Sequence, residues 1–213
     1  MIRISYNRGL LYNLCMNRQE SAFCVIIVFI AITLVWVFFF RKKDFELKCI
    51  VAGKDGNTYC VRDKRNMKES AELLAEATDR MTKLVKHLDA AFPENEAIQR
   101  LVSGFDPKKI SETLPNSKLV AYTENKSKMM FCLTEDKQSE SRLIDINTLM
   151  FVAIHELSHI ASKSIGHKQE FWDNFKFFLI ESEKIGIYSP EDYKQKPREF
   201  CGMKIKDNPI YDL

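Results

Sequence analysis

The clearest chemistry in this 213-residue sequence lies in the run HELSH at residues 155–159. In a helix, side chains four residues apart project from one face, so His155 and His159 can bind a single ion. Imidazole nitrogens are good ligands for Zn²⁺, and Glu156 points in an adjacent direction, where it can reach a water molecule at the metal without binding the metal. The run therefore predicts a zinc site with Glu156 as the general base of peptide-bond hydrolysis.

A catalytic zinc site needs a third protein ligand and an open position for water. We expect His167 to be this ligand, because it follows Gly166, where the chain can leave the helix, reverse and direct a side chain back. If His167 does not serve, a carboxylate of the next segment could, with Glu181 preferred over Glu170. His87 is expected on the polar face of another helix.

The surroundings of the motif strengthen the prediction, because HExxH alone also occurs by chance in helices that bind no metal. Residues 151–154 and most positions between His155 and residue 161 are apolar or uncharged. A helix of this composition is expected to be buried against a core. The simpler alternative is a pair of histidines without metal, and for His167 it is a helix cap or surface residue. The aromatic residues at 171–178 follow helical spacing and are expected to pack in the core.

Several elements must position these residues. The metal helix is predicted from Ile146 to about Ser164, with Asp145 or Asn147 as its N-cap and Gly166 as its stop. The remaining expected elements are listed by residue range: a hairpin at 46–52 and 58–63, a long helix at 67–91, a short helix at 94–102, a second hairpin at 118–124 and 128–135, a helix at 168–184, and a last strand within 200–205.

An apolar segment precedes this part of the chain. Residues 21–40 carry no charge, Pro or Gly, and twenty residues in a helix span about 30 Å, the thickness of a bilayer core. A cleaved signal peptide or a buried core helix fits the length and uniformity less well, so a membrane anchor is predicted. Basic residues at 41–43 and Lys48 outnumber Arg8 and Arg18 on the other side, which places the C-terminal domain in the cytosol and its basic flank at lipid headgroups.

Charge and cysteine content limit the remaining function classes. The net charge is +3, with Lys and Arg interleaved among Asp and Glu, so no nucleic-acid partner is expected. The six cysteines form no C-x-x-C pair, and buried free thiols are the default interpretation. In an oxidising compartment, pairing among Cys49, Cys60, Cys132 and Cys201 is the alternative.

The stretch HELSHIASKSIGHKQEFW resembles the zincin-type metallopeptidases of the WLM and SprT-like group, in which HExxH is followed by a later histidine and an aromatic pair. The matching positions are His155, Glu156, His159, His167, Phe171 and Trp172. The last third of the chain is also similar to uncharacterised proteins of large nucleocytoplasmic DNA viruses and some protists. The resemblance implies an α+β domain with a short antiparallel sheet beside the HExxH helix, a zinc ion and endopeptidase activity. One departure is the spacing, because seven residues separate His159 from His167, more than is usual in WLM-type members.

These inferences divide the chain into a tail (1–20), a transmembrane anchor (21–40) and a zincin-like domain (41–213). The predicted function is that of a single-pass, membrane-anchored zinc metallopeptidase acting on a protein or peptide at a host or virion membrane. The alternative is a catalytically inactive protein of such a membrane that retains the zinc fold as a scaffold. Activity on proteins crosslinked to DNA, known among the relatives, is not carried over, because the chain lacks a basic domain.

Overall fold

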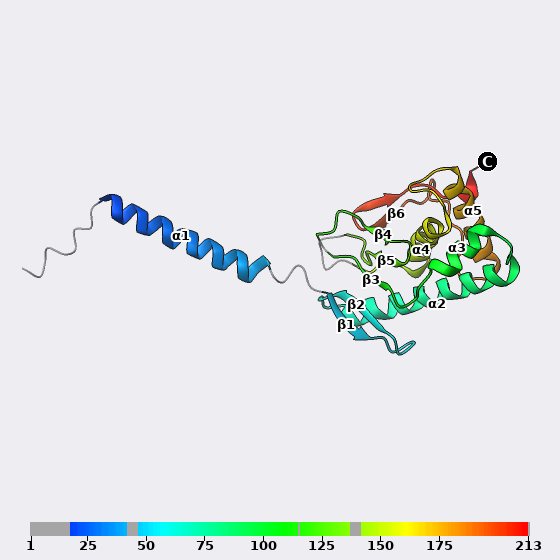
Figure 1. Ribbon diagram of the computed structural model, residues 1–213, viewed down its shortest axis with the longest axis horizontal. Coiled ribbons are helices and arrows are strands. Elements are labelled where there is room, and N and C mark those ends of the chain that lie inside the picture. Colours follow the sequence, from blue (N-terminus) through cyan, green and yellow to red (C-terminus); the bar gives the residue numbers. More distant parts are fainter. Residues whose placement is uncertain (1–17, 42–46, 115, 137–141, 213) are drawn as a thin grey trace, which may run out of the picture. The chain divides into compact units, whose positions relative to one another are not determined.

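The computed structural model describes residues 18–41, 47–114, 116–136 and 142–212, and for 18–24 and 37–41 only the backbone. The chain divides into two compact units, Met1–Phe45 and Glu46–Leu213. The fold is mixed α+β (Figure 1). The helices among the described residues are α1 (Arg18–Arg41), α2 (Met67–Ala91), α3 (Glu96–Gly104), α4 (Ile146–Ala161), α5 (Gln169–Lys184) and the short 3₁₀ helix η3 (Pro209–Tyr211).

The first unit contains α1, and here the structure corrects the membrane prediction. Within the described residues, no helix is long and apolar enough to cross a bilayer. The anchor predicted at residues 21–40 is therefore wrong. The single-pass localisation, with its cytosolic orientation, is overturned as well. Lys42, Lys43 and most of the predicted tail lie outside the described residues.

The second unit is built around a five-stranded sheet with the order β1-β2-β3-β5-β4. Its strands are β1 (Leu47–Val51), β2 (Thr58–Arg62), β3 (Ile110–Glu112), β4 (Ala121–Glu124) and β5 (Lys128–Phe131). The two predicted hairpins are present as the antiparallel pairs β1/β2 and β4/β5. In the first turn, Gly56 has a φ of +71°, which favours glycine, and the Asp55 carboxylate accepts a hydrogen bond from the Asn57 amide at 2.9 Å.

Strand β3 is the element that the sequence analysis missed. It runs parallel to β2 on one side and to β5 on the other, so it joins the two hairpins into one sheet. The sheet is therefore mixed, and the wholly antiparallel sheet that the resemblance implied is incorrect. A three-residue strand has too few positions to show an alternating pattern. The order of strands leaves β4 at one edge of the sheet.

Helix α4 lies in the middle of the second unit, where it contacts α2, α3, α5 and the edge strand β4 (Figure 1). Most of its side chains are buried, as its uncharged sequence predicts. Asp145 is its N-cap and accepts a hydrogen bond from the Thr148 amide at 2.9 Å. The helix ends at Ala161, earlier than the predicted Ser164, and Gly166 with a φ of +80° falls inside the following loop.

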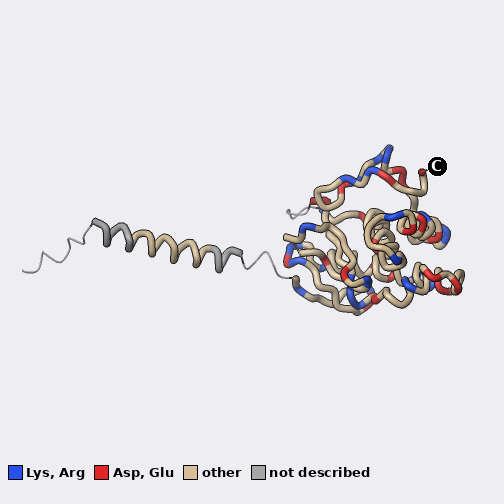
Figure 2. Tube along the Cα trace, turned by 45° about the horizontal axis from the view of Figure 1, so that its top comes forward, with Lys and Arg blue, Asp and Glu red and all other residues tan. Residues whose placement is uncertain are grey.

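The C-terminal segment closes the core over α4 and α5. Phe171, Phe175 and Phe178 on α5 are almost completely buried, which confirms their packing role. The single strand expected within 200–205 is instead a small hairpin of β6 (Arg198–Phe200) and β7 (Met203–Ile205). Charges of both signs are interspersed along the second unit (Figure 2).

Two disulfides correct the default interpretation of the cysteines as free thiols. Cys49 and Cys60 lie directly opposite each other in the β1/β2 register, with their Cα atoms 3.9 Å apart. Cys132 and Cys201 join the end of β5 to the turn between β6 and β7. Pairing depends on strand register and on contacts between distant segments, and spacing along the chain reveals neither.

Candidate metal centre

Three histidines from two segments meet at one point. His155 and His159 lie one turn apart on α4, and His167 comes from the loop before α5. One ligand nitrogen from each lies within 4.8 Å of the others. Among the described residues, this is the one group of three or more His, Cys, Asp or Glu side chains close enough together to bind a metal ion, and it is called the metal-competent group below. The Nε2 atoms of His155 and His167 are 3.1 Å apart. Two nitrogens bound to one tetrahedral zinc ion would be separated by about 3.3 Å, so the arrangement fits this metal.

The electrostatics of the histidines also suit a metal. Burial, together with the positive charges that His159 and His167 would carry, lowers the pKa of His155 to about 3. Burial likewise lowers the pKa of His159 to about 4, with additional contributions from His167 and Lys126. Both imidazoles are therefore neutral at pH 7. A neutral imidazole has the free lone pair that metal coordination requires.

The buried ring of Phe171 contacts all three imidazoles. Its centroid lies 4.7 Å from that of His155, 4.4 Å from that of His159 and 4.6 Å from that of His167. The sequence analysis assigned this residue to the core, and the structure adds that its ring packs against all three imidazoles. The sequence offered one signal for this contact: Phe171 matches the first residue of the aromatic pair that follows the later histidine in the WLM and SprT-like pattern.

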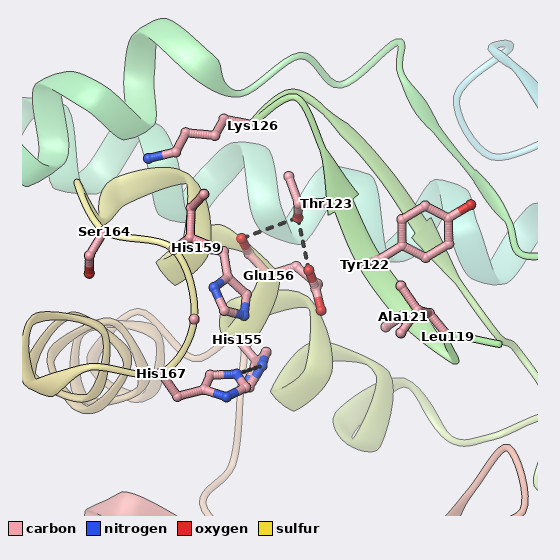
Figure 3. A pocket seen from close by; sticks show the side chains of 12 residues that line it. Leu119, Ala121, Tyr122, Thr123, Lys126, His155, Glu156, His159, Ser164 and His167 are labelled. Atoms are coloured by element: carbon pink, nitrogen blue, oxygen red, sulfur yellow. Dashed lines mark hydrogen bonds between the residues drawn. The ribbon is translucent and has the colours of Figure 1, made fainter.

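Glu156 is buried beside the histidines, and its carboxylate faces the edge strand. The Thr123 hydroxyl donates a hydrogen bond to Glu156 Oε2 at 2.8 Å (Figure 3). Burial raises the pKa of Glu156 to about 7, although the Thr123 hydrogen bond opposes the shift. A cation held by the histidines would favour the carboxylate form. The sequence analysis missed Thr123, because only the fold brings β4 next to α4.

The residues of the centre open into one pocket of about 370 Å³ (Figure 3). Strand β4 and its flanks form one wall through Leu119, Ala121, Tyr122, Thr123 and Lys126. Helix α4 and the loop at residues 164–167 form the other wall. Small-molecule and peptide sites commonly have volumes of a few hundred cubic ångströms. The predicted base and the three predicted ligands thus share one accessible cavity.

The two glutamates considered as alternative ligands have other partners. Glu181 Oε2 lies 2.8 Å from Nε2 of His87, and Glu181 Oε1 accepts a hydrogen bond from Lys184 at 2.6 Å. Glu170 accepts hydrogen bonds from the backbone of Lys163 and from Arg100. Neither carboxylate belongs to the metal-competent group of the described residues. His87 was expected on the polar face of its helix, which is α2. Its imidazole faces α5, where Glu181 is its partner.

Comparisons with known proteins relate the chain to proteins of large DNA viruses. It is 27% identical over 195 residues to the uncharacterized protein R325 of Acanthamoeba polyphaga mimivirus, covering 88% of this chain and 98% of that protein. It is 30% identical over 81 residues to the uncharacterized protein 136R of Invertebrate iridescent virus 6, covering 38% of this chain and 44% of the relative. It is 34% identical over 107 residues to the uncharacterized protein 042R of Invertebrate iridescent virus 3, covering 48% of this chain and 65% of that relative.

The expected similarity to proteins of large DNA viruses is thus confirmed. No protein-family model matches the chain, and no solved structure matches it. The WLM and SprT-like resemblance therefore rests on the motif residues alone.

Proposed function

We propose that this protein is a zincin-type zinc metallopeptidase in which His155, His159 and His167 hold the ion and Glu156 is the general base. The observation that carries the proposal is the convergence of three imidazole ligands and one buried carboxylate on a single open pocket. The ligands come from segments that the fold must bring together, so a chance HExxH sequence would not produce this arrangement.

The donor set and its spacing fit zinc. When bound, zinc would supply the positive charge that polarises a peptide carbonyl and makes water more acidic. Glu156, held as a carboxylate by the nearby cation, would take the proton of the attacking water and pass it to the departing amine. Thr123 keeps the carboxylate directed into the pocket.

The shape of the pocket supports a protein or peptide substrate. Strand β4 is an edge strand, and a row of unpaired backbone groups can accept an extended peptide as an additional strand. Leu119 and Ile165, on opposite walls, are 56% and 91% exposed, so both offer apolar contacts to substrate side chains. We therefore propose an endopeptidase that prefers apolar residues near the cleaved bond.

The decisive experiment compares the full-length protein with its Glu156→Gln variant. Zinc content is measured after dialysis, and cleavage of casein is followed with and without a chelator. We expect about one zinc ion per chain in both proteins, and cleavage only in the wild type. Glu183→Gln on α5 is the matched control, because Glu183 is exposed and lies on another helix, and this variant should cleave normally.

Two results would contradict the proposal. If the wild-type protein binds no zinc, the three histidines do not form the proposed metal centre. Stoichiometric zinc without Glu156-dependent cleavage of varied substrates would favour a catalytically inactive zinc protein, whose metal stabilises the fold instead of acting on a substrate.

A further inference from the structure

The loop that carries His167 is long, and its shape decides whether this residue reaches the other two histidines. Helix α4 ends at Ala161 and α5 begins at Gln169, so the chain must reverse direction between them. A flexible connection of this length would spread His167 over many positions. A ligand in such a loop needs supporting contacts outside the metal site.

Glu170, in the first turn of α5, provides such contacts to the start of the loop. Its Oε1 and Oε2 atoms each lie 3.1 Å from the Lys163 amide nitrogen, and Oε2 lies 3.4 Å from the Ser164 amide nitrogen. The hydrogen bond from the Lys163 amide is the main reason why the pKa of Glu170 lies below its usual value. The carboxylate is therefore ionised at neutral pH. An anionic acceptor strengthens hydrogen bonds from backbone amides.

Arg100, on α3, joins this carboxylate to the end of the metal helix. Its Nη2 atom donates to Glu170 Oε1 at 3.0 Å, and its Nε atom donates to the Ala161 carbonyl at 2.6 Å. One guanidinium group thus connects the last residue of α4 with the first turn of α5. The Lys126 ammonium adds a hydrogen bond to the carbonyl of Ser162.

The second half of the loop has far less support. Ile165 is 91% exposed, and Gly166, with a φ of +80°, has no atom within 4 Å of the position that a Cβ would occupy. His167 itself is held by its ring contacts with His155, Phe171 and Trp172. The direction in which the chain leaves Ser164 therefore depends on the contacts made by Glu170 and Arg100.

From these contacts we propose that Glu170 and Arg100 are positioning residues of the metal centre, which hold the loop so that His167 completes the ligand set. They act through His167 and do not touch the metal. The inference rests on the proposed zinc function and deepens it. Supporting residues outside the ligand set typically change metal affinity by about 10- to 100-fold.

The test measures zinc affinity of the full-length protein by competition with a chelator. Glu170→Ala and Arg100→Met should each weaken zinc binding about 10- to 100-fold, and Glu170→Gln, which retains one acceptor oxygen, should weaken it less. His167→Ala provides the reference for loss of the ligand itself. Glu183→Ala on the same helix is the matched control and should bind zinc normally.

Two further measurements separate positioning from a general loss of structure. In the metal-free protein, the Lys163 amide should exchange its hydrogen faster in Glu170→Ala, while amides within α4 keep their protection. In the cobalt-substituted protein, the visible absorption of Glu170→Ala should shift toward that of His167→Ala. Zinc at saturating concentration should restore cleavage by the Glu170 variants, which a misfolded protein could not show.

The outcomes distinguish this inference from the proposed function. Zinc binding that requires His167 but is unchanged in Glu170→Ala and Arg100→Met would overturn the positioning role and leave the metallopeptidase proposal intact. A wild-type protein without zinc affinity would overturn both. If Glu170→Ala does not fold, Glu170→Gln and Arg100→Met decide the question by the same criteria.

Discussion

Thr123 and Glu156 connect the edge of the sheet to the metal helix. The Thr123 hydroxyl oxygen lies 2.8 Å from Glu156 Oε2 and 3.4 Å from the Glu156 carbonyl oxygen. The hydroxyl has one proton to donate, and the shorter distance favours the carboxylate. The strand that forms one wall of the pocket therefore also fixes the orientation of the proposed general base.

Replacement of Thr123 by Val should reduce kcat about tenfold or more with little change in KM. Valine has a similar shape but leaves the buried carboxylate without its donor, and a hydrogen bond to a charged group contributes about 1.5–3 kcal/mol. Steady-state cleavage of a peptide by the full-length variants would measure this effect. Thr123→Ser, which keeps the hydroxyl, should retain most activity, and equal losses in the Val and Ser variants would argue against the orienting role.

Local patterns in the sequence were sufficient to predict most helices and the central motif. The helix at 67–91 and the two hairpins occur where periodicity and turn residues placed them. His155, Glu156 and His159 were recognisable because one helical turn separates the two histidines. His167 could be nominated from its position after Gly166, although the structure shows that α4 ends well before this glycine.

Contacts between distant segments could not be predicted in the same way. Arg100 lies 61 residues before Ala161, the residue whose carbonyl it binds, and no local pattern connects them. Thr123 resembles any other strand residue until β4 is placed beside α4. The apolar composition of residues 21–40 suggested a membrane span, which the described helix does not support. The contacts of Arg100 and Thr123 depend on how the elements pack, and neither composition nor spacing determines that packing.

Gly104 is a second point where close packing supports the centre. A Cβ atom there would lie 2.6 Å from Ile160 Cγ2 and 2.8 Å from the carbonyl oxygen of Lys126. Gly104→Ala should therefore destabilise the protein by about 1–3 kcal/mol, as overpacking does, even though alanine usually favours a helix. Because Ile160 follows His159, zinc affinity should fall as well.

Urea unfolding of the metal-free protein, followed by circular dichroism, would measure the stability of the Gly104 variant. The matched control is Gly53→Ala, where the new Cβ would lie 3.1 Å from the Glu72 carboxylate, so a shift of a few tenths of an ångström in one side chain relieves the contact, although that carboxylate also accepts hydrogen bonds from the Gly53 and Lys54 amides. Equal stability changes in the two variants would show that the contact with Ile160 and Lys126 is not restrictive.

The two disulfides should differ in their contribution to stability. A crosslink stabilises more when it closes a longer loop of the unfolded chain, and the sequence separations are 69 residues for Cys132 and Cys201 but 11 for Cys49 and Cys60. Chain-entropy estimates give about 4 kcal/mol for the longer loop and about 3 kcal/mol for the shorter one. Urea unfolding of the two double Cys→Ala variants without reductant would test this order. The reverse order would contradict the loop-length argument.

The N-cap of α4 should make part of the stability depend on pH. Partial burial would raise the pKa of Asp145, but hydrogen bonds from the Thr148 hydroxyl and amide, together with the charge of Arg198, lower it below its usual value. A carboxylate with a lowered pKa in the folded state adds stability above its unfolded pKa of about 3.9, and this stability is lost as pH falls through the folded value. Asp145→Asn, which preserves the cap, should lose this pH-dependent part.

Asp145→Ala removes the cap itself and should cost about 1 kcal/mol at pH 7. Urea unfolding of the metal-free wild type and both variants at pH 7 and at pH 3 would separate the two effects. We expect the wild type to exceed Asp145→Asn in stability at pH 7, and the difference to shrink at pH 3, where the Asp145 carboxylate becomes increasingly protonated. A difference that stays constant between the two pH values would show that the charge of Asp145 does not stabilise the helix that carries His155, Glu156 and His159.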